Sequence, residues 1–345
     1  MKLLFITQKV DKNDPVLGFV HRWIEKFSEK CELITVICLE KGEYRFPKNV
    51  VVISLGKELI KTRSGLVYFF YKIFFAARFL FLVFRMNDRD ETVFVHMNAE
   101  YLALAGWLWR IKRRKVLMWY NHKFGSFFLK ISAFWATNIL YTSRHAYSAR
   151  YAHGRIMPAG IDTDLFRRDQ SVAREPRSIL SLGRIAPVKR IELIIDAVSG
   201  LVGRGVVCRL HIYGAAEPRD KGYYEMLRAR ARDLEERGII FFHDAISPNQ
   251  APHIYNKYEI FVNVTQEGSF DKTVLEALAC EMQVVTTNSS FDGVVGEGFV
   301  EEDKITHKID IFLERANTDL SIFRDQLREE LQKKYGLDKL IEMLS

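Results

Sequence analysis

The chain alternates short apolar runs with longer segments that have helical periodicity. In the first half the apolar runs are 3–7, 33–39, 50–55, 92–97, 116–120, 139–142 and 155–158. A typical segment between them is Phe19 to Lys30, in which Phe19, Trp23 and Phe27 are four residues apart, as on one face of a helix. Strands that alternate with helices in this way predict a parallel sheet covered on both faces.

The same alternation continues in the second half, with apolar runs at 178–182, 209–214, 239–242, 260–264 and 283–287. Between the halves, the charged stretch 167–177 lacks apolar periodicity and contains Pro176, which indicates a linker. A chain of 345 residues with 48% hydrophobic content can form two cores. We therefore predict two α/β domains, 1–166 and 167–319, followed by a charged helical region at 320–345.

One predicted helix, 66–84, is nearly all aromatic and aliphatic, interrupted by Lys72 and Arg78. It has the length of a membrane span, but two central cations would each cost roughly 2.5–3.5 kcal/mol on insertion scales. Too many of its faces carry Phe or Tyr for an ordinary surface helix. We expect a helix that lies in a membrane interface or is partly buried; the alternative is a core helix.

The positive charge of the chain is local. Residues 101–161 contain ten basic side chains and no acidic one, whereas the remaining residues carry 41 basic and 43 acidic side chains. The density is highest at Arg110, Lys112, Arg113, Arg114 and Lys115, which we expect to meet an anionic membrane surface. Nucleic acid is the competing partner, but the neighbouring residues are large and apolar and form no recognisable nucleic-acid module.

Two features bear on the cellular compartment. The first apolar run ends at Gln8, so it is too short for the hydrophobic region of a signal peptide and predicts a strand. Four cysteines, Cys31, Cys38, Cys208 and Cys280, show neither metal-ligand spacing nor a disulfide framework. We expect a cytoplasmic protein with reduced thiols, attached peripherally to the inner face of the membrane.

A polar turn, 265–273, stands between the strand 260–264 and a short helix of small residues. In a parallel sheet this turn lies at the carboxyl ends of the strands, where ligands bind and free helix N–H groups can face an anion. Asp271 fits either a ligand contact or the N-cap of the helix. Glu276 falls within the small apolar helix, where an unpaired carboxylate would be costly, so we expect it to have a hydrogen-bonding partner.

The stretch from Glu267 to Thr287 resembles the donor-sugar signature of the retaining glycosyltransferases of family 4. That signature is a Glu, seven residues, a second Glu, a helix of small residues and a Pro-Val-Val strand; here eight residues separate Glu267 from Glu276, and Gln283 replaces the Pro. The resemblance implies that Glu276 holds the nucleotide ribose and Glu267 the transferred sugar. With the extra residue, Gln266, Ser269 or Asp271 could take the second role. We assign four turn residues to donor binding: Ser269, Phe270, Asp271 and Lys272.

Two further elements are similar to the same family. Gly183-Arg184 and Lys189 resemble its Gly-Arg-x-x-x-x-Lys phosphate element and bracket a turn between a strand and a helix. Guanidinium and ammonium groups suit a diphosphate, although two solvated turn cations would have the same pattern. The segment 157–166 is similar to the Pro-x-Gly-Val-Asp-x-x-x-Phe element that precedes the interdomain linker in this family.

Candidates in the first half are fewer. Gly18 follows the long loop 11–17, and it either serves the turn or makes the donor-phosphate contact that the resemblance implies. His122, in Trp-Tyr-Asn-His-Lys, resembles the family histidine that approaches the donor sugar, and His96 ends another strand. In the second half, Gly214 and the turn at His243 could form further walls of the nucleotide pocket.

The resemblance implies the GT-B fold, in which two Rossmann-like domains face across a cleft and the last helix, 320–344, crosses back to the first domain. The donor would be a UDP- or GDP-linked sugar held mainly by the C-terminal domain. Its sugar would pass with retention to a saccharide or lipid-linked acceptor in cell-surface glycan biosynthesis. No Asp-x-Asp metal clamp occurs at a suitable strand end, so we expect neither a metal nor another cofactor.

Two other functions compete with this prediction. The shifted spacing beside Glu267 would also fit a non-catalytic nucleotide-sugar or membrane-surface binding protein on the same scaffold. A dinucleotide-dependent oxidoreductase is disfavoured, because no Gly-x-Gly-x-x-Gly follows the first strand.

Overall fold

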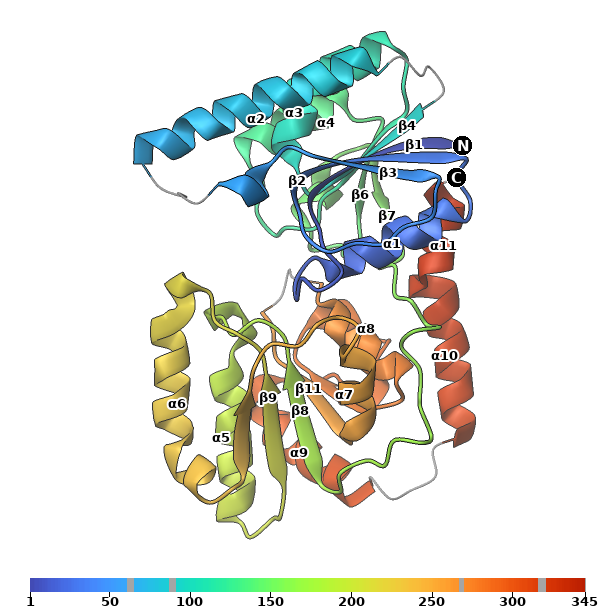
Figure 1. The fold of residues 1–345 in the computed structure, drawn as a ribbon. Coiled ribbons are helices and arrows are strands. Elements are labelled where there is room, and N and C mark those ends of the chain that lie inside the picture. The colour runs from blue at the N-terminus through green and yellow to red at the C-terminus, as the bar shows by residue number, and fades with distance from the viewer. Residues whose placement is uncertain (61–64, 87–90, 267–269, 316–320, 345) are drawn as a thin grey trace. The chain divides into compact units, whose positions relative to one another are not determined.

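The computed structural model describes residues 1–345 except 61–64, 87–90, 267–269, 316–320 and 345 (Figure 1). The chain divides into two compact units, Met1–Met157 with Leu340–Ser345 and Pro158–Lys339. Each unit contains one β-sheet in which every described strand pair is parallel. The predicted alternation of strands and helices is confirmed, and so is the α/β class.

The sheet of the first unit has the strand order β3-β2-β1-β4-β5-β6-β7. Its strands are β1 (Lys2–Val10), β2 (Leu33–Lys41), β3 (Val50–Ser54), β4 (Glu91–His96), β5 (Val116–Trp119), β6 (Asn138–Tyr141) and β7 (Gly154–Ile156). Its helices are α1 (Gly18–Ser28), α2 (Gly65–Arg85), α3 (Ala99–Ile111) and α4 (Phe127–Trp135), with 3-10 turns η1 (Lys57–Leu59) and η2 (Tyr147–Arg150). After β3 the chain returns to the other side of β1, so the switch point of this sheet lies between β1 and β4.

Both faces of this sheet are buried, as the continuous apolar runs predicted. Leu4 and Ile6 of β1 belong to the hydrophobic cluster that α2, α3 and α4 cover. Phe5 points to the opposite face, where its ring lies 6.1 Å from that of Phe27 in α1 and 5.0 Å from that of Phe94. Alternate residues of one strand thus serve two cores, which is why residues 3–6 are all apolar.

Helix α2 is attached to the first unit along one narrow stripe. Phe75, Phe79 and Val83 are its buried residues, and the Phe79 ring lies 4.5 Å from that of Tyr101 in α3. By length and composition α2 could cross a membrane. Only 17% of its apolar 18-residue stretch is buried. The alternative of an ordinary core helix is therefore wrong, because most of its apolar side chains face outward.

The basic cluster 110–115 does not form a uniform anion-binding patch, which corrects part of the prediction. Lys112 Nζ donates to the Met86 carbonyl at 2.6 Å, and Arg114 Nη2 donates to the same oxygen at 3.1 Å. Arg114 is buried. The last carbonyl groups of a helix have no hydrogen-bonding partner within the helix. These two cations supply a partner at the end of α2. Arg110, Arg113 and Lys115 remain exposed.

The sheet of the second unit has the strand order β10-β9-β8-β11-β12. Its strands are β8 (Ser178–Leu182), β9 (Arg209–Tyr213), β10 (Ile240–His243), β11 (Ile260–Asn263) and β12 (Gln283–Thr286). Its helices are α5 (Ile191–Gly203), α6 (Lys221–Glu236), α7 (Ala251–Lys257), α8 (Lys272–Ala279), α9 (Ile305–Arg315) and α10 (Ser321–Tyr335). The chain passes from β8 through β9 to β10 and then returns to β11, so the switch point lies between β8 and β11.

The boundary between the units lies before residues 158–166, not after them as we predicted. Ala159, Ile161 and Phe166 are buried in a cluster of the second unit, and the Phe166 ring lies 6.0 Å from that of Tyr255. The packing of these apolar side chains decides which unit the segment joins.

The predicted single crossing helix, 320–344, is two helices, α10 and α11 (Leu337–Leu344), separated by Gly336. The Tyr335 carbonyl accepts hydrogen bonds from the backbone N–H groups of Gly160 and Ile161, at 2.9 and 3.0 Å, which ties the end of α10 to the second unit. Within this C-terminal region, α10 and the start of α11 belong to the second unit, and the residues from Leu340 onward belong to the first.

Candidate functional site

In the second unit, two turns meet at the carboxyl ends of neighbouring strands. The first follows β8 and contains Gly183, Arg184 and the 3-10 turn η3 (Pro187–Lys189); the second follows β11 and leads to α8. The backbone N–H of Gln266 donates to the Val188 carbonyl at 3.1 Å and joins the two turns. The two predicted cations, Arg184 and Lys189, line the hollow between the two turns. Gly183, Asn263 and Thr265 line it as well.

Lys189 forms an ion pair with Asp271, which stands on the other turn. The Asp271 carboxylate also accepts hydrogen bonds from Asn263 Nδ2 at 2.8 Å and from Thr265 Oγ1 at 3.2 Å. Its second oxygen accepts from Thr273 Oγ1 at 2.9 Å and, more weakly, from the Thr273 backbone N–H at 3.4 Å. Asp271 is the N-cap of α8, so that alternative is confirmed, and the same carboxylate also orients Lys189.

These contacts keep Asp271 ionised. Burial by itself would raise its pKa, but the Lys189 ammonium and the hydrogen bonds from Asn263 and Thr273 lower the pKa of Asp271 to about 2. Both oxygens are engaged in the turn. Asp271 is therefore better suited to hold Lys189 than to bind a sugar hydroxyl in place of Glu267.

Arg184 forms an ion pair with Glu217 that is more exposed to solvent than the Lys189–Asp271 pair. Its Nη1 donates to Glu217 Oε1 at 2.7 Å, and Arg219 Nη2 lies 2.9 Å from the other oxygen of Glu217. The hydrogen bond from Arg184 lowers the pKa of Glu217. Because Arg184 and Glu217 are 35% and 42% exposed, water competes with this ion pair, and an anionic ligand could displace Glu217 at little cost.

Two glycines bring the backbones of β8 and β9 together beside Arg184. Gly183 has φ +147°, a conformation that side chains rarely adopt, and a Cβ on Gly214 would lie 1.9 Å from the Gly183 carbonyl oxygen. The N–H of Gly214 donates to the His243 carbonyl at 3.2 Å. The absence of side chains at these two positions is therefore what allows the turn to take its shape.

Glu276 has the hydrogen-bonding partner that its position in the helix predicted. Tyr255 of α7 donates its hydroxyl to Glu276 Oε2 at 2.9 Å. Burial raises the pKa of Glu276 to about 7, and burial also lowers the pKa of Lys272, one helical turn earlier, to about 7. Glu276 is partly exposed as a residue. The charge of Asp271, which caps the same helix, further raises the pKa of Glu276.

The structure thus brings Arg184, Lys189 and Asp271 to one edge of the second sheet, where the helix that carries Lys272 and Glu276 begins. Glu267 and Ser269 lie outside the described residues, so their assigned roles stay predictions. Phe270 packs its ring against those of Phe291 and Tyr335, 4.8 and 6.2 Å away, which fixes the start of α8; its donor contact also stays a prediction.

Sequence reasoning missed the residues that position the predicted ones. Asn263 and Thr265 hold Asp271, Tyr255 holds Glu276, and Glu217 holds Arg184. Asn263 ends an apolar strand at the carboxyl edge, and this position could have identified it. Tyr255 is 21 residues before Glu276 on another helix, and no local pattern connects the two.

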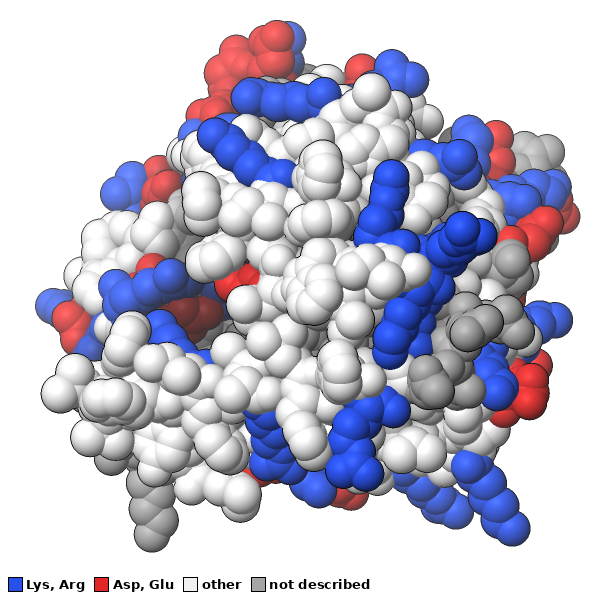
Figure 2. Space-filling view, turned by 90° about the horizontal axis from the view of Figure 1, so that it is seen from above, with Lys and Arg blue, Asp and Glu red and all other residues white. Residues whose placement is uncertain are grey.

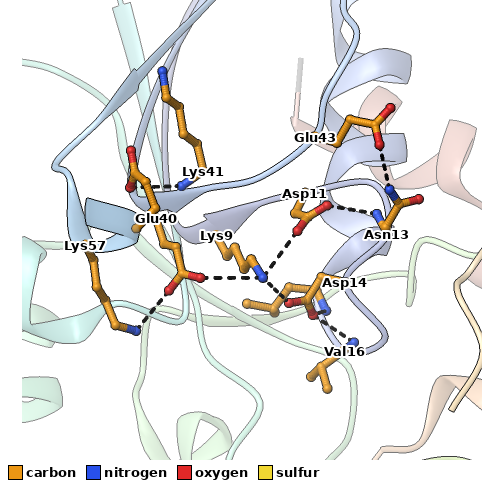
Figure 3. Close-up of polar contacts among 11 residues, drawn as sticks. Lys9, Asp11, Asn13, Asp14, Val16, Glu40, Lys41, Glu43 and Lys57 are labelled. Carbon is orange, nitrogen blue, oxygen red and sulfur yellow. Dashed lines mark hydrogen bonds and ion pairs between the residues drawn. The ribbon is translucent and has the colours of Figure 1, made fainter. Parts of the chain in front are cut away.

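In the first unit, a network of charges orders the loop before Gly18 (Figure 3). Lys9 Nζ donates to Asp14 Oδ2 at 2.8 Å and forms ion pairs with Asp11 and Glu40 at 3.3 and 3.6 Å. The Gly18 N–H donates to the Asp14 carbonyl at 2.9 Å, and α1 begins there. Gly18 therefore starts a helix next to the switch point of its sheet, and its phosphate contact stays a prediction.

The two candidate histidines have different surroundings. His96 is buried: its Nδ1 lies 3.4 Å from Thr7 Oγ1, and its ring contacts those of Phe19 and Trp23. His122 is exposed in the loop between β5 and α4, and its ring lies 5.5 Å from that of Tyr120. His122 is thus accessible to a ligand, whereas His96 serves packing. The approach of His122 to a donor sugar stays a prediction.

The geometry in the second unit suits a ligand with a diphosphate at one end and neighbouring hydroxyl groups at the other. Arg184 and Lys189 are cations with N–H donors near a helix start, the arrangement that binds phosphate oxygens. Glu276 is a carboxylate that can accept hydrogen bonds from hydroxyls. Among the described residues no cluster of three or more His, Cys, Asp or Glu side chains could hold a metal ion.

The comparisons with known proteins agree with this chemistry. Residues 162–319 match the family model "Glycosyl transferases group 1". A stretch of 153 residues is 27% identical to mannosylfructose-phosphate synthase of Agrobacterium fabrum (strain C58 / ATCC 33970). That match covers 41% of this chain and spans about a third (34%) of the relative. The family model names group 1 as a whole, so the assignment to family 4 stays a prediction.

Several solved structures share the fold over the whole chain. The Anabaena protein Alr3699/HepE in complex with UDP and glucose has a TM-score of 0.75 at 14% identity, covering 100% of this chain and 98% of that one. Sucrose-phosphate synthase from Thermosynechococcus elongatus has a TM-score of 0.76 at 13% identity, covering 99% and 97%. These likenesses confirm the GT-B fold, with a Rossmann-like sheet in each unit.

Proposed function

Because residues 162–319 match the family model of the glycosyl transferases group 1, we propose that the protein transfers a sugar from a nucleotide-sugar donor to an acceptor hydroxyl. One observation carries the proposal: Arg184 and Lys189 line one hollow at the switch point between β8 and β11, and Lys189 is paired with Asp271, the N-cap of the helix that carries Glu276. In open α/β sheets ligands bind at this point.

Arg184 and Lys189 bind the donor diphosphate. An ammonium has three donors, so Lys189 can keep its bond to Asp271 and still donate to a phosphate oxygen. Arg184 can release the exposed Glu217 and donate two parallel N–H groups to the phosphate. Charge-assisted hydrogen bonds of this kind contribute about 1.5–3 kcal/mol each.

Glu276 binds the ribose of the donor. The Tyr255 hydroxyl occupies one carboxylate oxygen, and the remaining acceptor positions are available to neighbouring ribose hydroxyls. The half-buried position of Glu276 excludes part of the competing water and so strengthens these bonds.

In the reaction the bond between the anomeric carbon and the diphosphate oxygen breaks, and a bond from that carbon to the acceptor oxygen forms. The acceptor proton leaves to the departing diphosphate or to water. Negative charge grows on the diphosphate in the transition state, where Arg184 and Lys189 stabilise it electrostatically. We propose retention at the anomeric carbon, as the resemblance at Glu267–Thr287 implies, with His122 and Glu267 contacting the transferred sugar.

The donor is a UDP- or GDP-linked sugar, and the UDP and glucose named for Alr3699/HepE make UDP-glucose the first to test. The acceptor is a saccharide or a lipid-linked saccharide of cell-surface glycan synthesis. Because two cations meet the diphosphate charge, we expect transfer to need no metal ion, and EDTA should leave the rate unchanged.

The decisive experiment combines binding and turnover. UDP and GDP are screened by thermal shift, since a ligand that binds only the folded state raises the unfolding midpoint. Hydrolysis of, or transfer from, the matching nucleotide sugar is then measured. Binding without any turnover over a panel of acceptors would instead favour a non-catalytic nucleotide-sugar binding protein.

Arg184→Ala and Lys189→Ala should each lower turnover by roughly 10- to 100-fold. Arg204→Ala is the matched control, because Arg204 is an exposed cation at the far end of α5 that pairs with Asp310. Wild-type rates in both site variants would refute the phosphate role.

A further inference from the structure

The exposed aromatic side chains are concentrated on neighbouring helices of the first unit. Among the residues whose side-chain exposure the structure describes, every exposed Phe or Trp lies between positions 69 and 134: Phe69, Phe70, Phe74, Phe81, Phe84, Trp107, Phe124, Phe127, Phe128 and Phe134. They belong to α2, α3, α4 and the loop before α4, and their outer surface is called the α2–α4 face below. Scattered apolar side chains are ordinary on a protein surface, whereas a concentration of this kind indicates an interaction site.

The three helices form one layer over the sheet of the first unit (Figure 1). Helix α3 packs against both α2 and α4. Its Gly106 permits the close approach of α4, because a Cβ at that position would lie 2.4 Å from Cβ of Trp135. On the side of α3 that faces α2, Phe79 of α2 is fully buried against Tyr101 of α3. The exposed aromatic residues therefore stand on a fixed platform.

The α2–α4 face carries cations and almost no anions. Helices α2 and α4 contain Lys72, Arg78, Arg85 and Lys130 and no acidic residue. No Asp or Glu occurs from 101 to 161. Figure 2 shows this side of the unit as a broad uncharged area with Lys and Arg side chains around and within it and few Asp or Glu side chains.

Two cations of α2 already lie over aromatic rings. Lys72 Nζ lies 5.2 Å from the centre of the Tyr68 ring, and the Arg85 guanidinium lies 5.3 Å from that of Phe81. Long basic side chains of this kind can bury their stems along an apolar surface and keep the charge at its aqueous boundary. The cations in α2 are therefore compatible with insertion of the neighbouring rings into a lipid headgroup region.

We propose that the α2–α4 face docks on an anionic lipid bilayer, with α2 lying in the plane of the interface. The aromatic and aliphatic side chains would enter the headgroup and upper acyl region, while the cations meet anionic headgroups. Helix α2 lies on the bilayer and does not cross it, because Phe75, Phe79 and Val83 hold it against α3.

Charge decides between a bilayer and a second copy of the chain. In a twofold-symmetric dimer the same patch meets itself, which would bring the cations of α2 and α4 against an identical set. An anionic leaflet complements those cations. Nucleic acid would also complement them, but the aliphatic residues Leu66, Val67, Ile73 and Ile111, which are all exposed on the same helices, offer it neither stacking nor hydrogen bonds.

The test is cosedimentation of the full chain with vesicles of phosphatidylglycerol and phosphatidylcholine, and with phosphatidylcholine vesicles alone. One variant combines Phe70→Ser, Phe74→Ser and Phe84→Ser, and another combines Lys72→Glu and Arg85→Glu; all five side chains are exposed. Val207→Ser and Arg232→Glu, exposed positions of the second unit, are the controls. We expect each combined variant to bind anionic vesicles about tenfold more weakly, and the controls to bind like the wild type.

Brominated phosphatidylcholine, mixed into the anionic vesicles, gives a second measurement that needs no destabilising change. It should quench the emission of Trp107, which is 45% exposed, and the quenching should disappear in Trp107→Phe. The proposal is overturned if the wild type ignores anionic vesicles at low salt or if both combined variants bind as well as it does. It is also overturned if the triple Phe variant instead converts a wild-type dimer to a monomer, or if only nucleic acid is bound.

Discussion

Lys189 and Asp271 form an ion pair between two turns that are 82 residues apart in the chain. Lys189 ends the turn after β8, and Asp271 caps the helix that follows β11. One carboxylate thus starts a helix and orients a cation of the proposed phosphate site. This dual use makes the stability of the second unit and its donor binding depend on the same residue.

Replacing Asp271 by Asn should destabilise the protein in a pH-dependent way. Asn keeps the capping ability but loses the attraction to Lys189. Because the pKa of Asp271 is lowered from 3.8 to about 2, its stabilising contribution is complete above about pH 5 and is lost as the pH falls toward 2. We expect Asp271→Asn to lower the free energy of unfolding by about 2 kcal/mol at pH 7 and by about 1 kcal/mol at pH 3. Urea unfolding at both pH values measures this, and an equal loss at both would contradict it.

Glu276→Gln should make the protein more stable and less active. Burial raises the pKa of Glu276 from 4.5 to about 7, so the folded state binds the proton more tightly and wild-type stability falls as the pH rises through this window. A neutral amide removes that cost but accepts ribose hydroxyls less strongly. Lys272, with its pKa lowered to about 7, is largely neutral at pH 8, so little attraction is lost there.

At pH 8 we expect Glu276→Gln to raise the unfolding midpoint by a few degrees and to weaken binding of the nucleotide sugar by about tenfold. Glu225→Gln is the control, since Glu225 is an exposed carboxylate on α6. A variant that binds the donor as tightly as the wild type would show that Glu276 has only a structural role.

Gly214→Ala should disrupt the proposed phosphate turn. The new methyl group would meet the Gly183 carbonyl oxygen at 1.9 Å, so the turn that carries Arg184 must shift. Overpacking of this kind costs about 1–3 kcal/mol, and we expect both a lower melting temperature and weaker donor binding. Gly222→Ala tests the same change in the first turn of α6, where nothing lies within 4 Å, and it should be neutral or slightly stabilising. Equal effects of the two substitutions would refute the close approach.

Phe79→Ala and Phe74→Ala should differ strongly although both are Phe residues of α2. Phe79 is fully buried, and its removal should cost about 3–5 kcal/mol of unfolding free energy. Phe74 is 54% exposed, and its removal should change that free energy by about 0.5 kcal/mol or less. Denaturant unfolding in the absence of lipid measures both. Similar losses for the two variants would mean that α2 is buried on more than one face.

The sequence by itself determined the elements and the edge at which the site forms. Apolar runs of strand length alternate with amphipathic segments, and hydrophobic burial makes that periodicity a local property. The positions of Arg184 and Lys189 just beyond a predicted strand, and of Glu276 in the helix after another, were sufficient to associate them with the carboxyl edge, because parallel strands all end there. The resemblance to a glycosyltransferase family then supplied a chemistry for the same three residues.

Only the tertiary structure decided which charged groups meet. Strand order places Lys189 beside Asp271, and packing of α7 against α8 places Tyr255 on Glu276. The same long-range folding assigns Lys112 to the end of α2 and leaves the outer aromatic residues of that helix exposed. Burial patterns are encoded by nearest neighbours along the chain, whereas the pairing of charges depends on contacts between segments far apart in sequence.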